Sequence, residues 1–232
     1  MIPLTPGNSF HIFNHANGFE NVFCNAENFR YFLEKYWLYI YPVAETYAYC
    51  LMPNHFHVVV RIRKRQVIEA LIRNKNSSMN YLDLNFGKVK SVISNRNTDD
   101  VNFSKVKISD SQVEKYISRQ FANLFSCYTQ SFNKVYHRRG SLFIKNFKRE
   151  PINDKQHFLN VVVYTHRNPI HHGFCKEYNE WDFSSYNEIV EGNDNPVEMI
   201  KLLKMTGGIK LFMDIHRLAL RTVENFPEFD IP

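Results

Sequence analysis

The segment Tyr47-Ala-Tyr-Cys-Leu-Met-Pro-Asn-His-Phe-His-Val-Val-Val60 decides the fold that the sequence predicts. Two runs within and just beyond it, 47–52 and 55–62, are rich in the aromatic and β-branched residues that favour strands. Pro53 and Asn54 between the two runs are typical of a tight turn. The sequence therefore predicts a β-hairpin here.

The second strand of this hairpin has two chemically different faces. Because side chains alternate across a strand, His55 and His57 lie on one face, and Phe56, Val58 and Val60 lie on the other. The apolar set suits a protein core, which leaves two imidazoles side by side on the open face. Such a pair can converge on one metal ion, or it can consist of exposed or hydrogen-bonded histidines with no metal.

Apolar periodicity and turn signals predict further elements on both sides of the hairpin. Before the hairpin we expect a strand at 9–15, followed by a helix that starts after Asn25 as N-cap and ends before Pro42. After the hairpin we expect a short helix at 65–73, a long helix at 113–135, a strand at 141–147, a helix at 154–168 that Pro169 terminates, and a last helix around 209–223.

This order of elements predicts an α+β fold, a ferredoxin-like antiparallel sheet with helices packed on one face. We expect residues 1–190 to form a single domain and residues 191–232 to form a helical extension. Within the domain, about 64–110 is rich in Asn, Ser, Lys and Asp, which predicts an insertion or a mobile loop.

Composition narrows the class of protein. A hydrophobic fraction of 44% over 232 residues excludes wholesale disorder, and a net charge of +6 permits a nucleic-acid partner. The four cysteines form no CxxC pair, which argues against a zinc ribbon and a dense disulfide framework. Neither a signal-peptide layout nor a long apolar run is present, so we expect an intracellular protein with no membrane contact.

The helix expected at 154–168 carries a second polar group. At about 100° per residue, His157, Asn160, Tyr164 and Asn168 fall on one stripe, opposite the apolar side chains. Tyr164 and Asn168 are four residues apart, so their side chains are neighbours. Periodicity alone is equally compatible with an ordinary amphipathic helix whose tyrosine lies at the rim.

Together the two polar groups would suit phosphoryl transfer. A tyrosine with a pKa of about 10 is a poor nucleophile until a cation polarises the phosphate and favours the phenolate. Two imidazoles and an amide oxygen would leave metal positions open for phosphate oxygens. Such a mixed nitrogen and oxygen site suits Mg²⁺ or Mn²⁺, with the imidazoles favouring Mn²⁺.

Three segments, in this order along the chain, resemble the single-tyrosine HUH transposases of bacterial insertion sequences. The first is the hairpin segment with its His55-Phe-His57 triplet, and the last is Tyr164-Thr-His-Arg-Asn-Pro-Ile-His-His-Gly173. Between them, Phe132-Asn-Lys-Val-Tyr-His-Arg-Arg-Gly-Ser-Leu-Phe143 is similar to the segment before the last core strand, notably in the REP-associated tyrosine transposase branch. The resemblance extends over about residues 10–186.

The resemblance implies a metal-dependent endonuclease and strand transferase acting on single-stranded DNA near hairpins. His55 and His57 would be metal ligands, Asn168 a third ligand and Tyr164 the nucleophile that forms a 5′-phosphotyrosine link. The family fold is ferredoxin-like, and its reaction needs no nucleotide cofactor. We accordingly expect a bacterial, cytoplasmic, nucleoid-associated protein. Alternatives are a replication-initiator or relaxase-like nickase, and a hairpin-binding protein that is domesticated or has lost catalysis.

Basic residues interleaved with aromatics predict the DNA surface, because such a groove tracks phosphates and stacks exposed bases. The candidates are Arg138, Arg139, Lys145, Lys148 and Arg149, with Arg167 beside the tyrosine. The alternative for the first five is a solvated charged turn. The extra length at 64–110 and after Tyr186 leaves monomer and homodimer open, and favours the monomer.

Overall fold

The computed structural model describes residues 2–75, 107–192 and 196–221. Its four-stranded sheet has the order β2-β3-β1-β4, and all neighbouring strands are antiparallel. The strands are β1 (Ser9–His15), β2 (Ala44–Leu51), β3 (His55–Ile62) and β4 (Lys148–Ile152). With α1 (Ala26–Ile40) after β1 and α4 (Asp110–Val135) before β4, this is the ferredoxin-like arrangement. The predicted fold class is confirmed.

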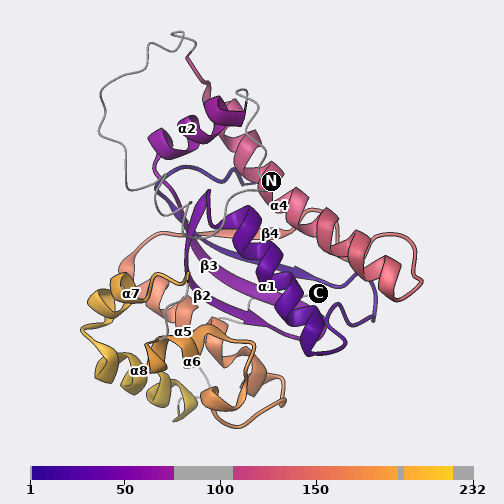
Figure 1. Ribbon diagram of the computed structural model, residues 1–232. Coiled ribbons are helices and arrows are strands. Elements are labelled where there is room, and N and C mark those ends of the chain that lie inside the picture. Colours follow the sequence, from indigo (N-terminus) through magenta and orange to yellow (C-terminus); the bar gives the residue numbers. More distant parts are fainter. Residues whose placement is uncertain (1, 76–106, 193–195, 222–232) are drawn as a thin grey trace.

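Helices cover both faces of the sheet (Figure 1). α1 and α4 pack on the face that carries Phe56, whose ring centre lies 5.2 Å from that of Phe32 in α1 and 5.8 Å from that of Phe125 in α4. α5 (Lys155–His171) packs on β2 and β3 on the side of His57. The one-sided packing expected from the sequence thus describes α1 and α4, while α5 encloses the histidine face.

The smaller elements lie at the two ends of the molecule, with α2 at one end and α6, α7 and α8 at the other (Figure 1). They are α2 (Arg65–Lys75), η2 (Tyr178–Glu180), α6 (Ser185–Glu191), α7 (Met199–Thr206) and α8 (Ile209–Arg221). The last helix is therefore where the sequence predicts it, except that 222–223 lie outside the described residues. The division into a domain and an extension at about residue 190 stays a prediction.

Elements with strong local signals start and end where the sequence predicts. β1 and β3 have the expected bounds, and α1 begins after Asn25, whose side chain accepts a hydrogen bond of 3.0 Å from the Asn28 amide. That bond satisfies one of the amides that a helix start leaves without a helical partner. α1 ends at Ile40, before Pro42.

The strand predicted at 141–147 is wrong. This segment makes a single isolated bridge, between Phe143 and Ala16, and then bends at Asn146, which has a positive φ of 63°. The residues that pair with β1 are those of β4, Lys148–Ile152. Their polar composition and Pro151 hide the strand signal, and proline is tolerated there because β4 lies at the edge of the sheet.

The helix end predicted at Pro169 is also wrong, because α5 continues through Pro169 to His171. A proline cannot donate a backbone hydrogen bond, and it disfavours helical backbone in the residue before it. Here that residue, Asn168, donates its side-chain amide to the Tyr164 carbonyl at 2.9 Å. Both Asn168 and Pro169 are buried, so packing holds the last turn in helical form.

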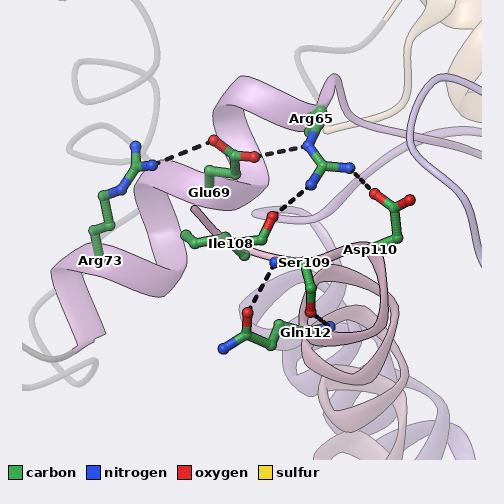
Figure 2. A network of polar contacts seen from close by, with 7 residues as sticks. All are labelled: Arg65, Glu69, Arg73, Ile108, Ser109, Asp110 and Gln112. Carbon is green, nitrogen blue, oxygen red and sulfur yellow. Dashed lines mark hydrogen bonds and ion pairs between the residues drawn. The ribbon is translucent and has the colours of Figure 1, made fainter. Parts of the chain in front are cut away.

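The segment expected to be an insertion is a helix at its start. Its part at 76–106 lies outside the described residues, whereas α2 occupies its first turns. Figure 2 shows how its two flanks are joined: Arg65 donates to Glu69 and to the Ile108 carbonyl, both at 2.7 Å, and pairs with Asp110. Ser109 caps α4 beside this cluster. The chain therefore leaves and re-enters the fold at one place.

Candidate functional site

The face of the sheet under α5 carries a layer of four histidines. His15 of β1 stands directly opposite His55 of β3, and their rings stack at 5.3 Å between centres. His11 and His57, one step along the same two strands, stack at 5.1 Å. Phe13 lies between them and is opposite His57 in the register. The two histidines predicted to share a face therefore do so, but they are buried under a helix.

His57 uses one ring nitrogen inside the protein. Its Nδ1 lies 3.0 Å from Nε2 of His11, whose other nitrogen faces the carboxylate of Glu150 at 3.9 Å. The second nitrogen of His57, Nε2, is buried and has no hydrogen-bond partner among the residues that the structure describes. Burial lowers the pKa of His57 well below its usual value, and the nearby His11 and His55 lower it further, which keeps the ring neutral.

His55 is arranged in the same way. Its Nδ1 lies 2.8 Å from the side-chain oxygen of Asn54, and because an amide oxygen only accepts, the ring donates there. Its Nε2 is buried and meets no partner within the described part of the chain. Burial, followed by His172 and His15, lowers the pKa of His55 to about 3, while the adjacent Asn168 side chain acts in the opposite direction.

α5 places Tyr164 and Asn168 over these two histidines. The ring of Tyr164 stands edge-on to His57, with 5.5 Å between ring centres and an angle of 90°. Asn168 donates its amide nitrogen to the Tyr164 carbonyl, so its oxygen, Oδ1, points elsewhere. That oxygen is buried and accepts no hydrogen bond from any described residue. The structure thus brings together all four residues that the sequence singles out for the site.

The donor set fits a divalent cation of mixed preference. Three electron-pair donors remain, Nε2 of His55, Nε2 of His57 and Oδ1 of Asn168, and each is buried in neutral form. Two imidazoles and an amide oxygen suit Mn²⁺ or Mg²⁺ and leave positions for phosphate oxygens. No cluster of three or more His, Cys, Asp or Glu side chains placed to hold a metal occurs in the ranges that the structure describes.

The predicted basic residues are spread over different environments. Arg138 pairs with Glu20 and donates to the Ser141 carbonyl at 3.0 Å, which makes it part of a turn. Arg149 is buried, with its guanidinium 4.2 Å from the centre of the Phe147 ring. Both Arg138 and Arg149 are therefore engaged within the protein.

Three other basic candidates are exposed: Arg139, Lys145 and Lys148. Lys148 is opposite Phe13 in the sheet register, so it lies on the histidine face. Lys145 lines a cavity of about 490 Å³ between α4 and residues 141–149, together with Arg149. Arg167, half-buried on α5, bears electrostatically on the buried Tyr178.

Sequence reasoning missed the side chains that hold the two imidazoles, namely His11, Glu150 and Asn54. His11 and His15 are four apart in a predicted strand and therefore share a face, which was an available signal. Which histidine each one meets depends on the strand register, and the register comes from the folded sheet.

A second buried histidine pair joins the C-terminal helices to α5. His166 lies 2.9 Å from His216 of α8 through one nitrogen and 2.8 Å from the hydroxyl of Ser185 through the other. Ser185 begins α6 and also accepts from the Tyr49 amide of β2 at 2.9 Å. The residue between Tyr164 and Asn168 on α5 is thus fixed from two sides.

Comparison with known proteins gives one structural likeness. No family model matches this chain, and no curated protein matches it. Among solved structures, it is similar to a REP-associated tyrosine transposase bound to a REP hairpin, with a TM-score of 0.48 and 14% identity over 84% of this chain and 87% of that one. None of the helices in the described ranges combines the length and the apolar character needed to cross a membrane.

Proposed function

We propose that this protein is a metal-dependent single-stranded DNA endonuclease and strand transferase, a transposase-type enzyme whose nucleophile is Tyr164. One observation carries the proposal. Three buried donor atoms, on His55, His57 and Asn168, lack hydrogen bonds to any described residue, and the Tyr164 ring stands 5.5 Å from that of His57. Leaving three polar atoms unsatisfied is costly in a core, so a ligand for them is the economical explanation.

His55, His57 and Asn168 would hold Mn²⁺ or Mg²⁺. When bound, that cation supplies charge neutralisation at the phosphate. The phenol oxygen of Tyr164 attacks the phosphorus of the scissile phosphodiester, a tyrosine–phosphorus bond forms, and the bond to the 3′ oxygen breaks. The proton lost by the phenol is balanced by the one gained by the 3′ oxygen. One phosphodiester replaces another, so the step reverses for rejoining and needs no nucleotide cofactor.

A single chain supplies every residue of this site. Tyr164 lies beside His57 of its own chain, and Asn168 beside His55, which supports cleavage in cis by a monomer. A homodimer that exchanged tyrosines would need α5 to leave the sheet that it covers. The bases and phosphates of a hairpin substrate would approach from the side of Lys148, which shares the histidine face.

The test is a covalent-adduct assay with hairpin DNA and Mn²⁺. Wild type should form a protein–DNA adduct that survives boiling in detergent and is linked through the 5′ phosphate. Tyr164→Phe should bind the hairpin with unchanged affinity and form no adduct, because it lacks only the attacking oxygen. The matched control is Tyr136→Phe, which removes a hydroxyl from a half-exposed tyrosine outside the site and should form the adduct normally.

An adduct in Tyr164→Phe would move the nucleophile elsewhere and contradict the proposal. Wild type that binds the hairpin but never forms an adduct would instead indicate a hairpin-binding protein without catalysis. Cleavage without rejoining would favour a relaxase-like nickase.

His57→Ala tests the cation separately. The variant loses one of three proposed donors, so Mn²⁺-dependent cleavage should fall by at least about 100-fold while hairpin binding persists. His171→Ala is the control, since it removes an exposed imidazole at the end of the same helix. Cleavage at the wild-type rate in His57→Ala would refute the metal assignment.

A further inference from the structure

We propose that Glu150 and His11 are positioning residues that hold His57 in the tautomer with its proton on Nδ1, so that Nε2 keeps its electron pair for the cation. This inference rests on the proposed function. It adds two residues, from strands β4 and β1, that act through His57 and do not touch the cation or the DNA.

The sheet register brings the three residues into line. His11 of β1 is directly opposite Glu150 of β4. On its other side, His11 lies diagonal to His57 of β3, whose direct partner is Phe13. The contacts follow from this placement: Glu150 Oε2 is 3.9 Å from Nδ1 of His11, and Nε2 of His11 is 3.0 Å from Nδ1 of His57.

The charge on Glu150 sets the direction of the hydrogen bond between the two histidines. A carboxylate close to Nδ1 of His11 favours the proton on that nitrogen, although 3.9 Å is too long for a direct hydrogen bond. A neutral His11 with its proton on Nδ1 has a bare Nε2, which only accepts. The proton in the 3.0 Å contact therefore belongs to Nδ1 of His57.

The surroundings of His57 require the same tautomer. With the proton on Nε2, His57 would present a buried N–H donor for which the described residues offer no acceptor. A buried donor without an acceptor is among the costlier defects in a core. With the proton on Nδ1, the donor is satisfied by His11, and the unsatisfied atom is a lone pair that faces the side of Tyr164 and Asn168.

The ring of His11 is held in place as well as paired. It is fully buried, with Phe13 at 4.9 Å and His57 at 5.1 Å against it, and Tyr164 edge-on at 5.8 Å between ring centres. His157 is the other charged neighbour that bears on it electrostatically. A ring packed in this way cannot turn over without moving α5, so its acceptor stays directed at His57.

The experiment reads tautomer and metal affinity without any catalytic step. Nitrogen-15 NMR of the metal-free full chain should show His57 with its proton on Nδ1. Calorimetric titration with Mn²⁺ should then give about 10- to 100-fold weaker binding in His11→Leu than in wild type. His11→Gln should restore most of the affinity, because its amide can accept from His57 and donate towards Glu150.

Glu150→Gln guards against a folding defect, since the side chain of Glu150 is 41% exposed and its removal leaves the core intact. This variant should weaken Mn²⁺ binding by about 3- to 10-fold and shift part of the His57 population to the Nε2–H tautomer. Glu27→Gln, an exposed acid in the first turn of α1, is the matched control and should change neither readout.

The possible failures are distinguishable. Wild type that binds no Mn²⁺ would overturn the metal of the proposed function, and this inference with it. Wild type that binds Mn²⁺ while His11→Leu and Glu150→Gln bind it equally well would overturn this inference alone. An Nε2–H tautomer of His57 in the wild-type protein would also overturn it.

Discussion

At the scale of single residues, the hydrogen bonds that the site side chains already make decide which of their atoms remain for a ligand. Asn54 takes the Nδ1 proton of His55, and the Tyr164 carbonyl takes the amide protons of Asn168. Each bond uses the end of the side chain that a cation does not need. The donor set is therefore oriented before any ligand arrives, which reduces the reorganisation that binding requires.

Asn168→Ala tests this orientation at the residue that α5 contributes. The variant loses the buried oxygen and should weaken Mn²⁺ binding by about 10-fold or more, with a matching loss of adduct formation. Losing the hydrogen bond to the Tyr164 carbonyl should lower the free energy of unfolding by only about 1 kcal/mol. Calorimetry and urea unfolding measure the two effects. Unchanged Mn²⁺ affinity would remove Asn168 from the donor set.

At the scale of elements, local signals and long-range pairing had different predictability. β1, β3 and the start of α1 could be predicted because alternation and an N-cap are written in consecutive residues. β4 could not, since its pairing with β1 joins residues such as Ser9 and Ile152 that only the folded sheet brings together. The same contrast applies to the site.

Spacing within one element revealed His55 with His57, and Tyr164 with Asn168, before the fold was known. The contact between His11 and His57 spans 46 residues, and that between His11 and Glu150 crosses to another strand. Neither leaves a trace in short-range spacing. The sequence thus predicted the side chains that would meet a ligand, and only the register could identify those that orient them.

The N-cap of α5 gives an element-scale prediction. Asp154 accepts a hydrogen bond of 2.8 Å from the His157 amide, so Asp154→Ala should lower the free energy of unfolding by about 1 kcal/mol. Asp154→Ser, which can still cap, should recover most of that loss. Tyr164 lies far along the helix and is held by packing on the sheet, so adduct formation should stay near wild type. A large loss of activity in Asp154→Ala would mean that the helix start helps to position Tyr164.

At the scale of the whole molecule, the net charge of +6 and the exposed basic residues predict salt-sensitive DNA binding. Replacing Arg139 and Lys148 together by Gln should weaken hairpin binding and reduce the slope of log K against log salt by about 1 to 1.5. Arg138→Gln is the contrast, because Arg138 is engaged with Glu20 and the Ser141 carbonyl. It should affect stability more than affinity. An unchanged salt slope in the double variant would show that these residues form only a solvated turn.

The protein also encloses several imidazoles in neutral form, and this couples its stability to pH. His11, His55, His57, His166 and His216 are all buried, and burial is the first cause of the lowered pKa of each. Protonation of such rings is opposed in the folded state and unopposed in the unfolded chain. Acid should therefore loosen the histidine layer and the joint between α5 and α8.

His216 isolates that effect away from the proposed metal site. Burial lowers its pKa from 6.5 to about 4, against a weaker opposing hydrogen bond to the Phe212 carbonyl. Its contribution is complete above about pH 6.5 and is lost as the pH falls towards 4, because the unfolded chain takes up the proton first. Between pH 8 and pH 5, one such ring should cost the wild type about 2 kcal/mol of unfolding free energy.

The measurement is urea unfolding of wild type and His216→Leu at several pH values. The variant begins less stable, since it loses the bond to His166, yet its stability should fall by about 2 kcal/mol less than that of wild type over the same interval. Buried histidines elsewhere contribute equally to both proteins and cancel in the comparison. Parallel pH profiles for the two proteins would show that His216 accepts its proton inside the fold, and that α8 stays joined to α5 in acid.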